Sequence, residues 1–378
     1  METMSTNNKA ETFLVQIGNQ KNETHHAIST PLYFSTAYRH DKIGVEEGYS
    51  YTRTGNPTRT VLEEAIAKLE GGDQAFATSS GMAAIHLVFS LFEKGSHFIS
   101  SRDIYGGSFR LFNVLQEKYD FEFSYWDGED EADISELIKT NTKAIFIETP
   151  TNPLMQTANL QKVSAIARNH HILHIVDNTL YSPYIQRPID EGADIVVHSA
   201  TKYLAGHNDV LAGLVIVKGK QLTEELAFLH NSIGSVLSPY DCWNLIRGLK
   251  TLALRMNQHE INARTVKRYL ESHPLVTAVY YPGRSGMLSF ELTEEALVEP
   301  FLKALNIFTF AESLGGVESF LTYPTTQTHG DIPEDVRLSY GLSNRLLRAS
   351  VGVEHPDDLI ADLKQAFERV SRLEVKTI

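Results

Sequence analysis

Short apolar runs and amphipathic stretches alternate along most of this chain. Between residues 61 and 218, runs of strand length are separated by stretches with helical spacing. Near-continuous apolar runs are typical of strands buried on both faces, and strands that alternate with helices form parallel sheets. The pattern predicts an α/β protein with a mostly parallel sheet. The predicted strands are 74–80, 97–101, 121–126, 143–149, 172–178, 193–199 and 212–218.

The pattern changes in the last third of the chain. Serine is a good N-cap and proline suits the first helical turn, so Ser238 and Pro239 predict the start of a long helix that stops before Pro274. A smaller α+β segment is expected beyond it. Its predicted strands are 276–281, 287–292, 308–313 and 346–353, and its predicted helices are 295–305 and 355–370.

These patterns predict three parts. The first sixty residues are polar, have little periodicity and are expected to form an arm with local turns. The long helix is expected to be the hinge between the large domain and the C-terminal domain. The predicted parts are an arm at 1–60, a large domain at 61–250 and a C-terminal domain at 251–378.

Composition excludes several classes of protein. The formal net charge of −13 argues against nucleic acid as the main partner, because phosphate backbones bind Lys and Arg. No apolar stretch reaches the roughly 18 residues of a membrane span. The single cysteine, Cys242, cannot build a disulfide framework or a cysteine zinc site, and no cluster of ligands supports a metal. A cytoplasmic protein without a metal or a secretory signal is expected.

In open α/β sheets, ligands bind at the carboxyl ends of the strands. One predicted strand runs directly into SSGMAAI, residues 79–85, where small residues open a helix whose exposed N–H groups suit an anion. Asp177 ends another strand, where a buried carboxylate needs a partner such as a cationic ring nitrogen, a metal or an arginine. An ordinary tight turn explains the first feature equally well, and a satisfied capping aspartate explains the second.

Two cationic residues complete the set of candidates. Lys202 closely follows a buried strand, and a desolvated lysine forms Schiff bases with carbonyl compounds. Arg348 alternates with apolar neighbours, and arginine binds carboxylates in a bidentate manner. A lysine that extends to solvent and a strand-edge arginine are the alternatives. Together, an anion turn, a strand-end carboxylate, a strand-end lysine and a later arginine match the needs of pyridoxal phosphate.

Eight motifs of the chain resemble one family of enzymes. They are YTRTGNPTR, SSGMAAI, YGGSFRLF, ETPTNP, VDNT, HSATKYLAGHND, AESLGGVES and RLLRASVGVE. In combination they are similar to the Cys/Met-metabolism group of pyridoxal-phosphate enzymes. This group includes cystathionine γ-synthase, cystathionine lyases, methionine γ-lyase and O-acylhomoserine sulfhydrylase. The resemblance runs from about residue 16 to the last predicted helix and implies the fold-type I architecture of these transferases.

The resemblance implies a role for each matching residue. Lys202 would form the imine with pyridoxal phosphate and act as the catalytic base, and Tyr105 would stack on the ring and handle a proton. Asp177 would pair with the ring nitrogen. The phosphate would be held by Gly81, Met82, Ser199 and Thr201, and by Tyr51 and Arg53 of a neighbouring subunit. Asn152, Arg348 and Ser313 would hold the substrate carboxylate. An obligate dimer, assembled into a homotetramer, follows from the shared sites.

The details of the motifs favour one branch of this family. Methionine γ-lyases resemble YGC where this chain has Gly107. Arg110 suits an enzyme that binds a second carboxylate, and Glu312 is similar to the synthase branch. Thr54 stands where enterobacterial synthases carry a second arginine, which favours an acetyl over a succinyl ester. Within the family, the chain resembles the bacillus-type cystathionine γ-synthase that is also an O-acetylhomoserine thiol-lyase.

Two other hypotheses remain from the sequence. A cystathionine γ- or β-lyase would share the same active-site residues, since both directions use the same groups. A cofactor-free α/β binding protein is the alternative from another class, and the pairing of Asp177 with Lys202 disfavours it.

Overall fold

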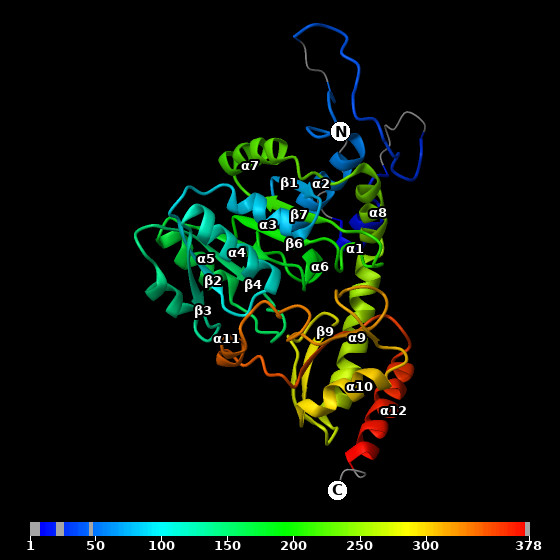
Figure 1. Ribbon diagram of the computed structural model, residues 1–378. Coiled ribbons are helices and arrows are strands. Elements are labelled where there is room, and N and C mark those ends of the chain that lie inside the picture. Colours follow the sequence, from blue (N-terminus) through cyan, green and yellow to red (C-terminus); the bar gives the residue numbers. More distant parts are fainter. Residues whose placement is uncertain (1–7, 20–25, 45–47, 375–378) are drawn as a thin grey trace. The chain divides into compact units, whose positions relative to one another are not determined.

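The computed structural model describes residues 8–19, 26–44 and 48–374 (Figure 1). The chain forms two compact units, and each unit contains segments that are distant in sequence. The first unit combines residues 1–93 with 167–253, and the second combines 94–166 with 254–378. The predicted division into arm, large domain and C-terminal domain stays a prediction.

A buried set of four strands forms the centre of the first unit. The strands lie in the order β1 (Gln74–Thr78), β7 (Gly213–Val217), β6 (Ile195–Ser199) and β5 (Leu173–Asp177). β5 and β6 are parallel, whereas β7 is antiparallel to both of its neighbours. The helices of this unit are α1 (Ala10–Val15), α2 (Pro57–Glu70), α3 (Gly81–Phe89), α6 (Ser182–Ile185), α7 (Lys220–Ile233) and α8 (Pro239–Leu249).

Helix α2 shows how local sequence sets these boundaries. The side chain of Asn56 accepts hydrogen bonds from the N–H groups of Thr58 and Arg59, and Pro57 occupies the first turn. Gly71 ends the helix with a φ of 85°, a left-handed conformation that glycine adopts without steric cost.

The second unit contains two groups of strands. Parallel strands lie in the order β4 (Thr142–Glu148), β2 (His97–Ser101) and β3 (Glu122–Trp126). A five-stranded sheet has the order β10 (Thr309–Phe310), β11 (Phe320–Thr322), β12 (Leu346–Ser350), β9 (Met287–Leu292) and β8 (Val276–Tyr280). The other elements are α4 (Gly106–Tyr119), η1 (Glu131–Leu137), η2 (Glu295–Leu297), α10 (Val298–Ala304), α11 (Glu334–Ser339) and α12 (Pro356–Glu374). Helices α5 (Leu160–Asn169) and α9 (Leu252–Glu271) each have residues in both units.

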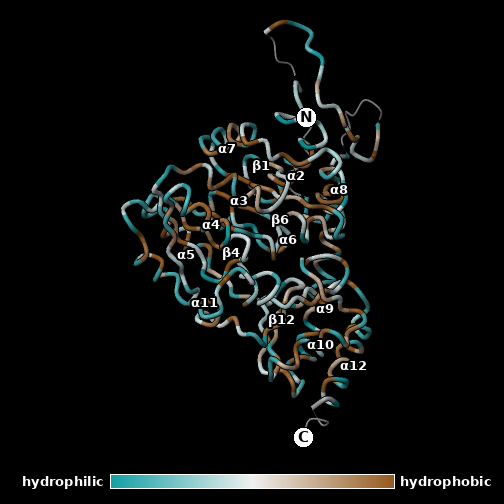
Figure 2. Tube along the Cα trace, viewed as in Figure 1, coloured by the Kyte–Doolittle hydropathy of each residue, from teal (hydrophilic) through white to brown (hydrophobic). Residues whose placement is uncertain are grey.

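The core of the five-stranded sheet explains the C-terminal sequence pattern. Phe290 of β9 and Leu347 of β12 are fully buried with Phe301 of α10 and Phe367 of α12. The two helices lie side by side in Figure 1. Along α12, hydrophobic and hydrophilic residues alternate in Figure 2, as expected for a helix with one buried face. The prediction of a C-terminal α+β segment is confirmed.

The prediction of one continuous long helix from residue 238 is wrong. The chain forms two helices, α8 and α9, which are interrupted at Lys250 and Thr251. Both the N–H and the hydroxyl group of Thr251 donate to the carbonyl of Gly248. These short-range bonds replace the regular helical pattern, and glycine is a weak helix former. Prediction from the sequence also missed β11 and the short helix α1.

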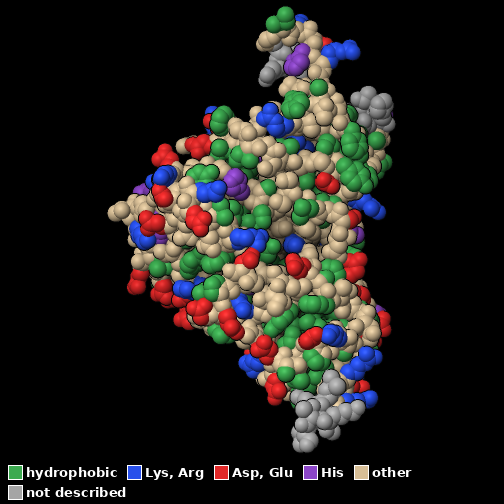
Figure 3. Space-filling view, in the orientation of Figure 1, with side chains coloured by type: hydrophobic (Ala, Val, Ile, Leu, Met, Phe, Trp, Pro, Cys, Tyr) green, Lys and Arg blue, Asp and Glu red, His purple; other side chains and the backbone are tan. Residues whose placement is uncertain are grey.

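The surface carries charges of both signs. On the face shown in Figure 3, the described Lys and Arg side chains lie among Asp and Glu side chains and form no continuous basic surface. No helix in the described part of the chain is long and apolar enough to cross a membrane. Within the same residues, no group of three or more His, Cys, Asp or Glu side chains could hold a metal ion.

Candidate active site

The first unit brings the start of α3 against the end of β6. The hydroxyl of Ser80 accepts a hydrogen bond from the N–H of Ala83 at 3.0 Å and caps the helix. A Cβ atom at Gly81 would lie 2.8 Å from the Cβ of Ser199, so glycine is needed for this approach. Gly81, Met82 and Ser199 are therefore neighbours at a helix N-terminus, where N–H groups and the helix dipole favour an anion.

The ends of β5 and β6 are joined through one threonine. Thr179 donates its N–H to the carboxylate of Asp177 at 3.0 Å, and its hydroxyl accepts the N–H of Ser199 at 2.8 Å. Burial raises the pKa of Asp177, while the bonds from Thr179 and the nearby His198 act in the opposite direction. A cation placed next to this carboxylate would stabilise its charged form, which is the role expected of a protonated ring nitrogen.

Lys202 lies in a compact turn directly after β6. Its N–H donates to the carbonyl of Ser199 at 3.1 Å, and its own carbonyl accepts from Gly206 at 2.8 Å. Thr201 exchanges hydrogen bonds with Ala212, because its hydroxyl accepts the N–H of Ala212 at 3.0 Å and donates to its carbonyl at 3.2 Å. The Thr201 hydroxyl thus already has two backbone partners, and its predicted contact with a phosphate stays a prediction.

A buried polar cluster that prediction from the sequence missed lies beside these residues. Glu70, at the end of α2, accepts hydrogen bonds from His198 and, at 3.0 Å, from Asn178. All three side chains are buried. His198 and Asn178 directly neighbour Ser199 and Asp177 in sequence, so the cluster fixes the ends of both strands. Their places in HSATKYLAGHND and VDNT were the only signal, and Glu70 gave none.

The predicted phosphate-binding residues of the arm are exposed in a single chain. Tyr51 is 49% exposed, and the guanidinium of Arg53 lies 5.6 Å from the centre of its ring. Arg53 also donates to the side-chain oxygen of Asn231 at 3.0 Å. Both side chains are accessible to another molecule, and their predicted role in a neighbouring subunit stays a prediction.

The second unit brings Arg348, Asn152 and Ser313 together. Arg348 of β12 is 1% exposed, and its guanidinium donates to the side-chain oxygen of Asn152 at 2.9 Å. It also donates to the carbonyl of Ser313 at 2.8 Å and to the hydroxyl of Thr322 at 2.9 Å. Ser313 has a φ of 84°, which is uncommon outside glycine. These contacts hold a buried cation in one orientation.

Tyr105 is positioned at the start of α4. Its N–H donates to the carboxylate of Glu148, at the end of β4, at 2.9 Å. The ring lies close to the backbone of Gly107, where a Cβ atom would be 2.4 Å from a ring carbon. A cysteine at this position would require the ring to move. Prediction from the sequence missed Glu148, although it is the first residue of the ETPTNP motif.

The two remaining predicted residues lie on the surface of the second unit. Arg110 of α4 forms an ion pair with Asp331, and both side chains are more than half exposed. Glu312 is also exposed. Exposed ion pairs contribute little to stability, so Arg110 can exchange its partner for another carboxylate at small cost.

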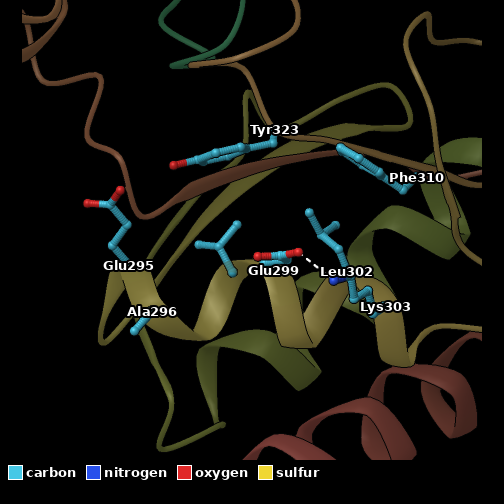
Figure 4. A pocket seen from close by; sticks show the side chains of 8 residues that line it. Glu295, Ala296, Glu299, Leu302, Lys303, Phe310 and Tyr323 are labelled. Carbon is cyan, nitrogen blue, oxygen red and sulfur yellow. Dashed lines mark hydrogen bonds and ion pairs between the residues drawn. The ribbon is translucent and has the colours of Figure 1, made fainter.

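A separate cavity of about 940 Å³ lies between α10 and the edge of the five-stranded sheet. Figure 4 shows the rings of Phe310 and Tyr323 on the opposite side of this cavity from α10. Apolar side chains line it together with Glu295, Glu299 and Lys303. None of the site residues predicted from the sequence is among the eight described residues that line it.

The residues of the first unit fit pyridoxal phosphate. The glycine-dependent approach of α3 to Ser199 leaves backbone N–H groups for a phosphate, and the burial of Asp177 requires a cationic partner. Lys202 supplies an amine in the turn between these groups and β7. When bound, this cofactor supplies an electron sink for carbanions.

Comparisons with known proteins agree with this donor set. The family model of the Cys/Met metabolism PLP-dependent enzymes matches residues 11–368. The cystathionine gamma-synthase/O-acetylhomoserine (thiol)-lyase of Bacillus subtilis is 55% identical over 360 residues, 95% of this chain and 96% of its own length. The cystathionine gamma-synthase of Haemophilus influenzae is 51% identical over 94% of this chain and 97% of its own length.

A solved structure extends the similarity to the fold. The cystathionine gamma-lyase of Lactobacillus plantarum, complexed with L-serine, matches with a TM-score of 0.94 and 44% identity, over 96% of this chain and 99% of its own. The fold and the donor set thus define a pyridoxal-phosphate enzyme of fold type I. The chain belongs to the Cys/Met metabolism PLP-dependent enzyme family. The predictions of family, fold class and cofactor are confirmed.

Proposed function

We propose that this enzyme catalyses γ-replacement on O-acetylhomoserine. Cysteine is the attacking thiol and cystathionine the product, and sulfide yields homocysteine in the same way, as steps of methionine biosynthesis by transsulfuration. The observation that carries this proposal is Arg110, an exposed cation on α4 five residues after Tyr105. The 55% identity to the bacillus enzyme of this double activity supports it.

Different residues carry out the separate steps of this reaction. Lys202 removes the α-proton of the substrate and moves it onward, and Asp177 keeps the ring nitrogen of the cofactor protonated. The Tyr105 hydroxyl handles a proton near the leaving group. A β-proton leaves, the Cγ–O bond breaks and acetate departs with that oxygen. The sulfur of the thiol then forms the new bond to the γ-carbon, the β-proton is returned, and the proton of the thiol is released.

Two carboxylates have to be bound during this reaction. Arg348 and Asn152, with Ser313 beside them, bind the α-carboxylate of the amino acid, since a held guanidinium suits a carboxylate. Arg110 binds the carboxylate of the incoming cysteine, and its ion pair with Asp331 breaks when it does so. Glu312 belongs to the same branch-specific set. Thr54 in place of a second arginine supports the acetyl over the succinyl ester, because threonine supplies no cation at this position for the second carboxylate of a succinyl ester.

The proposed assembly is a homotetramer of two active dimers in the cytoplasm. Gly81, Met82, Ser199 and Thr201 hold the phosphate from one chain, and Tyr51 and Arg53 reach it from the neighbouring chain. Exposed apolar side chains that follow one another closely in the same arm support this assembly, because a contiguous apolar patch marks a protein–protein contact. They include Ile28 at 73% and Phe34 at 67% exposed.

A comparison of substrates tests the proposed reaction. O-acetylhomoserine and O-succinylhomoserine are each supplied with cysteine or with sulfide, and cystathionine alone is the fifth reaction. The highest rate is expected with O-acetylhomoserine and cysteine. Arg110→Ala should raise the KM for cysteine about tenfold and leave the KM for sulfide unchanged, because sulfide has no carboxylate.

A cystathionine lyase of the same family is the second candidate. The 44% identity and the TM-score of 0.94 to a cystathionine gamma-lyase favour it. If only cystathionine alone is turned over, with release of cysteine or homocysteine, the synthase proposal is wrong and the lyase is correct.

A further inference from the structure

His329 joins two segments of the proposed active site in the second unit. Its side chain is fully buried, in the loop between β11 and α11. One ring nitrogen, Nε2, lies 3.1 Å from the carbonyl oxygen of Ile104 and 3.0 Å from that of Asn152. The other nitrogen, Nδ1, lies 2.8 Å from the hydroxyl of Thr328.

The chemistry of these partners fixes the tautomer. Carbonyl oxygens only accept hydrogen bonds, so Nε2 must carry the proton and donate to both. Nδ1 is then the acceptor, and the Thr328 hydroxyl donates to it. Burial and the nearby Arg348 lower the pKa of His329 to about 4, so the ring is neutral at physiological pH. A single N–H group therefore serves two carbonyls.

One carbonyl belongs to the neighbour of a predicted catalytic residue, and the other to a predicted substrate-binding residue. Ile104 directly precedes Tyr105, and the side chain of Asn152 contacts the guanidinium of Arg348. The same loop also presses on the start of α4, since a Cβ atom at Gly106 would lie 2.1 Å from the carbonyl of Thr328. The loop thus contacts the two segments from one side.

We propose that His329 is a positioning residue that sets the distance between Tyr105 and the carboxylate-binding pair of Asn152 and Arg348. This inference rests on the proposed function, because it assigns the α-carboxylate of the substrate to that pair. His329 touches neither substrate nor cofactor and acts through the backbone of its two partners. Its loss shifts Asn152 and thereby weakens the binding of amino acids that carry an α-carboxylate.

Two amide variants separate this role from general packing. In His329→Gln the amide nitrogen takes the place of Nε2 and can donate to both carbonyls, whereas in His329→Asn it takes the place of Nδ1. His97→Gln is the matched control. His97 is also fully buried in the second unit, bonds to Thr142 and Ser124, and has a pKa lowered to about 4 by burial.

The measurement is ligand binding to the holoenzyme, followed by the cofactor absorbance. L-alanine carries an amine and a carboxylate but no leaving group, and ethylamine lacks the carboxylate. His329→Asn is expected to weaken L-alanine binding about 10- to 100-fold, the effect of losing a buried hydrogen-bond donor, with ethylamine binding unchanged. His329→Gln should restore most of the L-alanine affinity, and His97→Gln should bind both amines as the wild type does.

Equal L-alanine affinity in folded His329→Asn and in His97→Gln would overturn the proposal. If His329→Asn does not fold, Thr328→Val decides instead, because it removes the donor to Nδ1 that keeps the proton on Nε2 for the two carbonyls. A several-fold loss of L-alanine affinity supports the proposal, and an unchanged affinity contradicts it. Failure of the proposed function is seen separately, as a wild-type enzyme that binds L-alanine but makes no cystathionine.

Discussion

The two units hold their proposed anion sites in different ways. In the first unit, the proposed anion would face the backbone of α3, and the missing side chain at Gly81 lets the helix approach Ser199. In the second unit, the proposed anion would face the buried side chain of Arg348, which Asn152 and Thr322 hold in place. Backbone N–H groups carry no charge to desolvate, whereas a buried guanidinium requires several acceptors.

The two proposed anion sites should therefore tolerate different kinds of substitution. A site built from backbone N–H groups requires close approach of the backbone, so any added side-chain atom at the contact disturbs it. The identity of the surrounding side chains matters less. A side-chain site depends on the chemistry of each partner, so it is sensitive to a change of donor geometry. The first suits a cofactor phosphate that stays bound, and the second suits a substrate carboxylate that enters and leaves in each turnover.

The largest effect is expected at Lys202, and it tests whether the first unit supplies the reactive amine. Lys202→Ala should lower kcat by about 10³-fold or more, because the variant lacks both the base and the amine that binds the cofactor. Borohydride treatment of the wild type should fix the cofactor to Lys202. Lys218→Ala, at an exposed lysine paired with Asp73, is the control. Normal turnover by Lys202→Ala would break the assignment.

The next effect tests the side-chain site of the second unit. Arg348→Lys keeps the charge but loses the planar fork that contacts Asn152 and Ser313, so the KM for the amino acid should rise about 10- to 100-fold. Arg345→Lys replaces the neighbouring arginine, which pairs with Glu291, and should leave KM unchanged. A KM in Arg348→Lys equal to that of the control would show that charge alone is sufficient.

A smaller effect tests the backbone site of the first unit. Gly81→Ala places a methyl group against Ser199 and should destabilise the holoenzyme by about 1–3 kcal/mol, with faster loss of the cofactor. Denaturation and the cofactor absorbance after dialysis measure both effects. Gly55→Ala, where the new Cβ would meet only the ring of Tyr49, should retain the cofactor. Equal retention in both variants would remove the requirement for close approach.

The smallest effect concerns stability and should leave neutral-pH activity unchanged. Burial, with a contribution from Arg168, lowers the pKa of His174 from 6.5 to about 3. The unfolded chain therefore gains a proton below pH 6.5 that the folded chain does not, so stability is complete above that pH and is lost as the pH falls. The loss at pH 5 is about 2 kcal/mol. In His174→Gln, urea unfolding should change less between pH 7 and 5; an unchanged difference would contradict this cause.

Much of this architecture was predictable from local patterns. The strands of the first unit follow from apolar runs, and Asp177, Ser199 and Lys202 follow from their positions at strand ends. These residues lie at or just after the carboxyl ends of strands, and the order of residues along the chain is sufficient to locate those ends. The interruption between α8 and α9 was not predictable, because it depends on hydrogen bonds at Gly248 and Thr251 inside a helical pattern.

The supporting residues of both sites depend on contacts between distant segments. Glu70 and His198 are 128 positions apart in sequence, and His329 is 225 positions from Ile104. A single sequence gives no pairing information at such separations, and each residue alone resembles an ordinary polar residue. Spacing therefore predicts candidate reactive groups, and only the folded chain shows which residues contact and support them.

The turn that carries Lys202 has a consequence for protein engineering. The carbonyl of Lys202 accepts from Gly206, and Thr201 bonds to Ala212, so the segment 207–211, whose residues 207–209 are exposed, lies between two anchored residues. Lengthening a loop whose two ends are already held costs little free energy. This segment is therefore a suitable position to insert a reporter peptide or an affinity tag, a few residues in sequence from the lysine proposed to react.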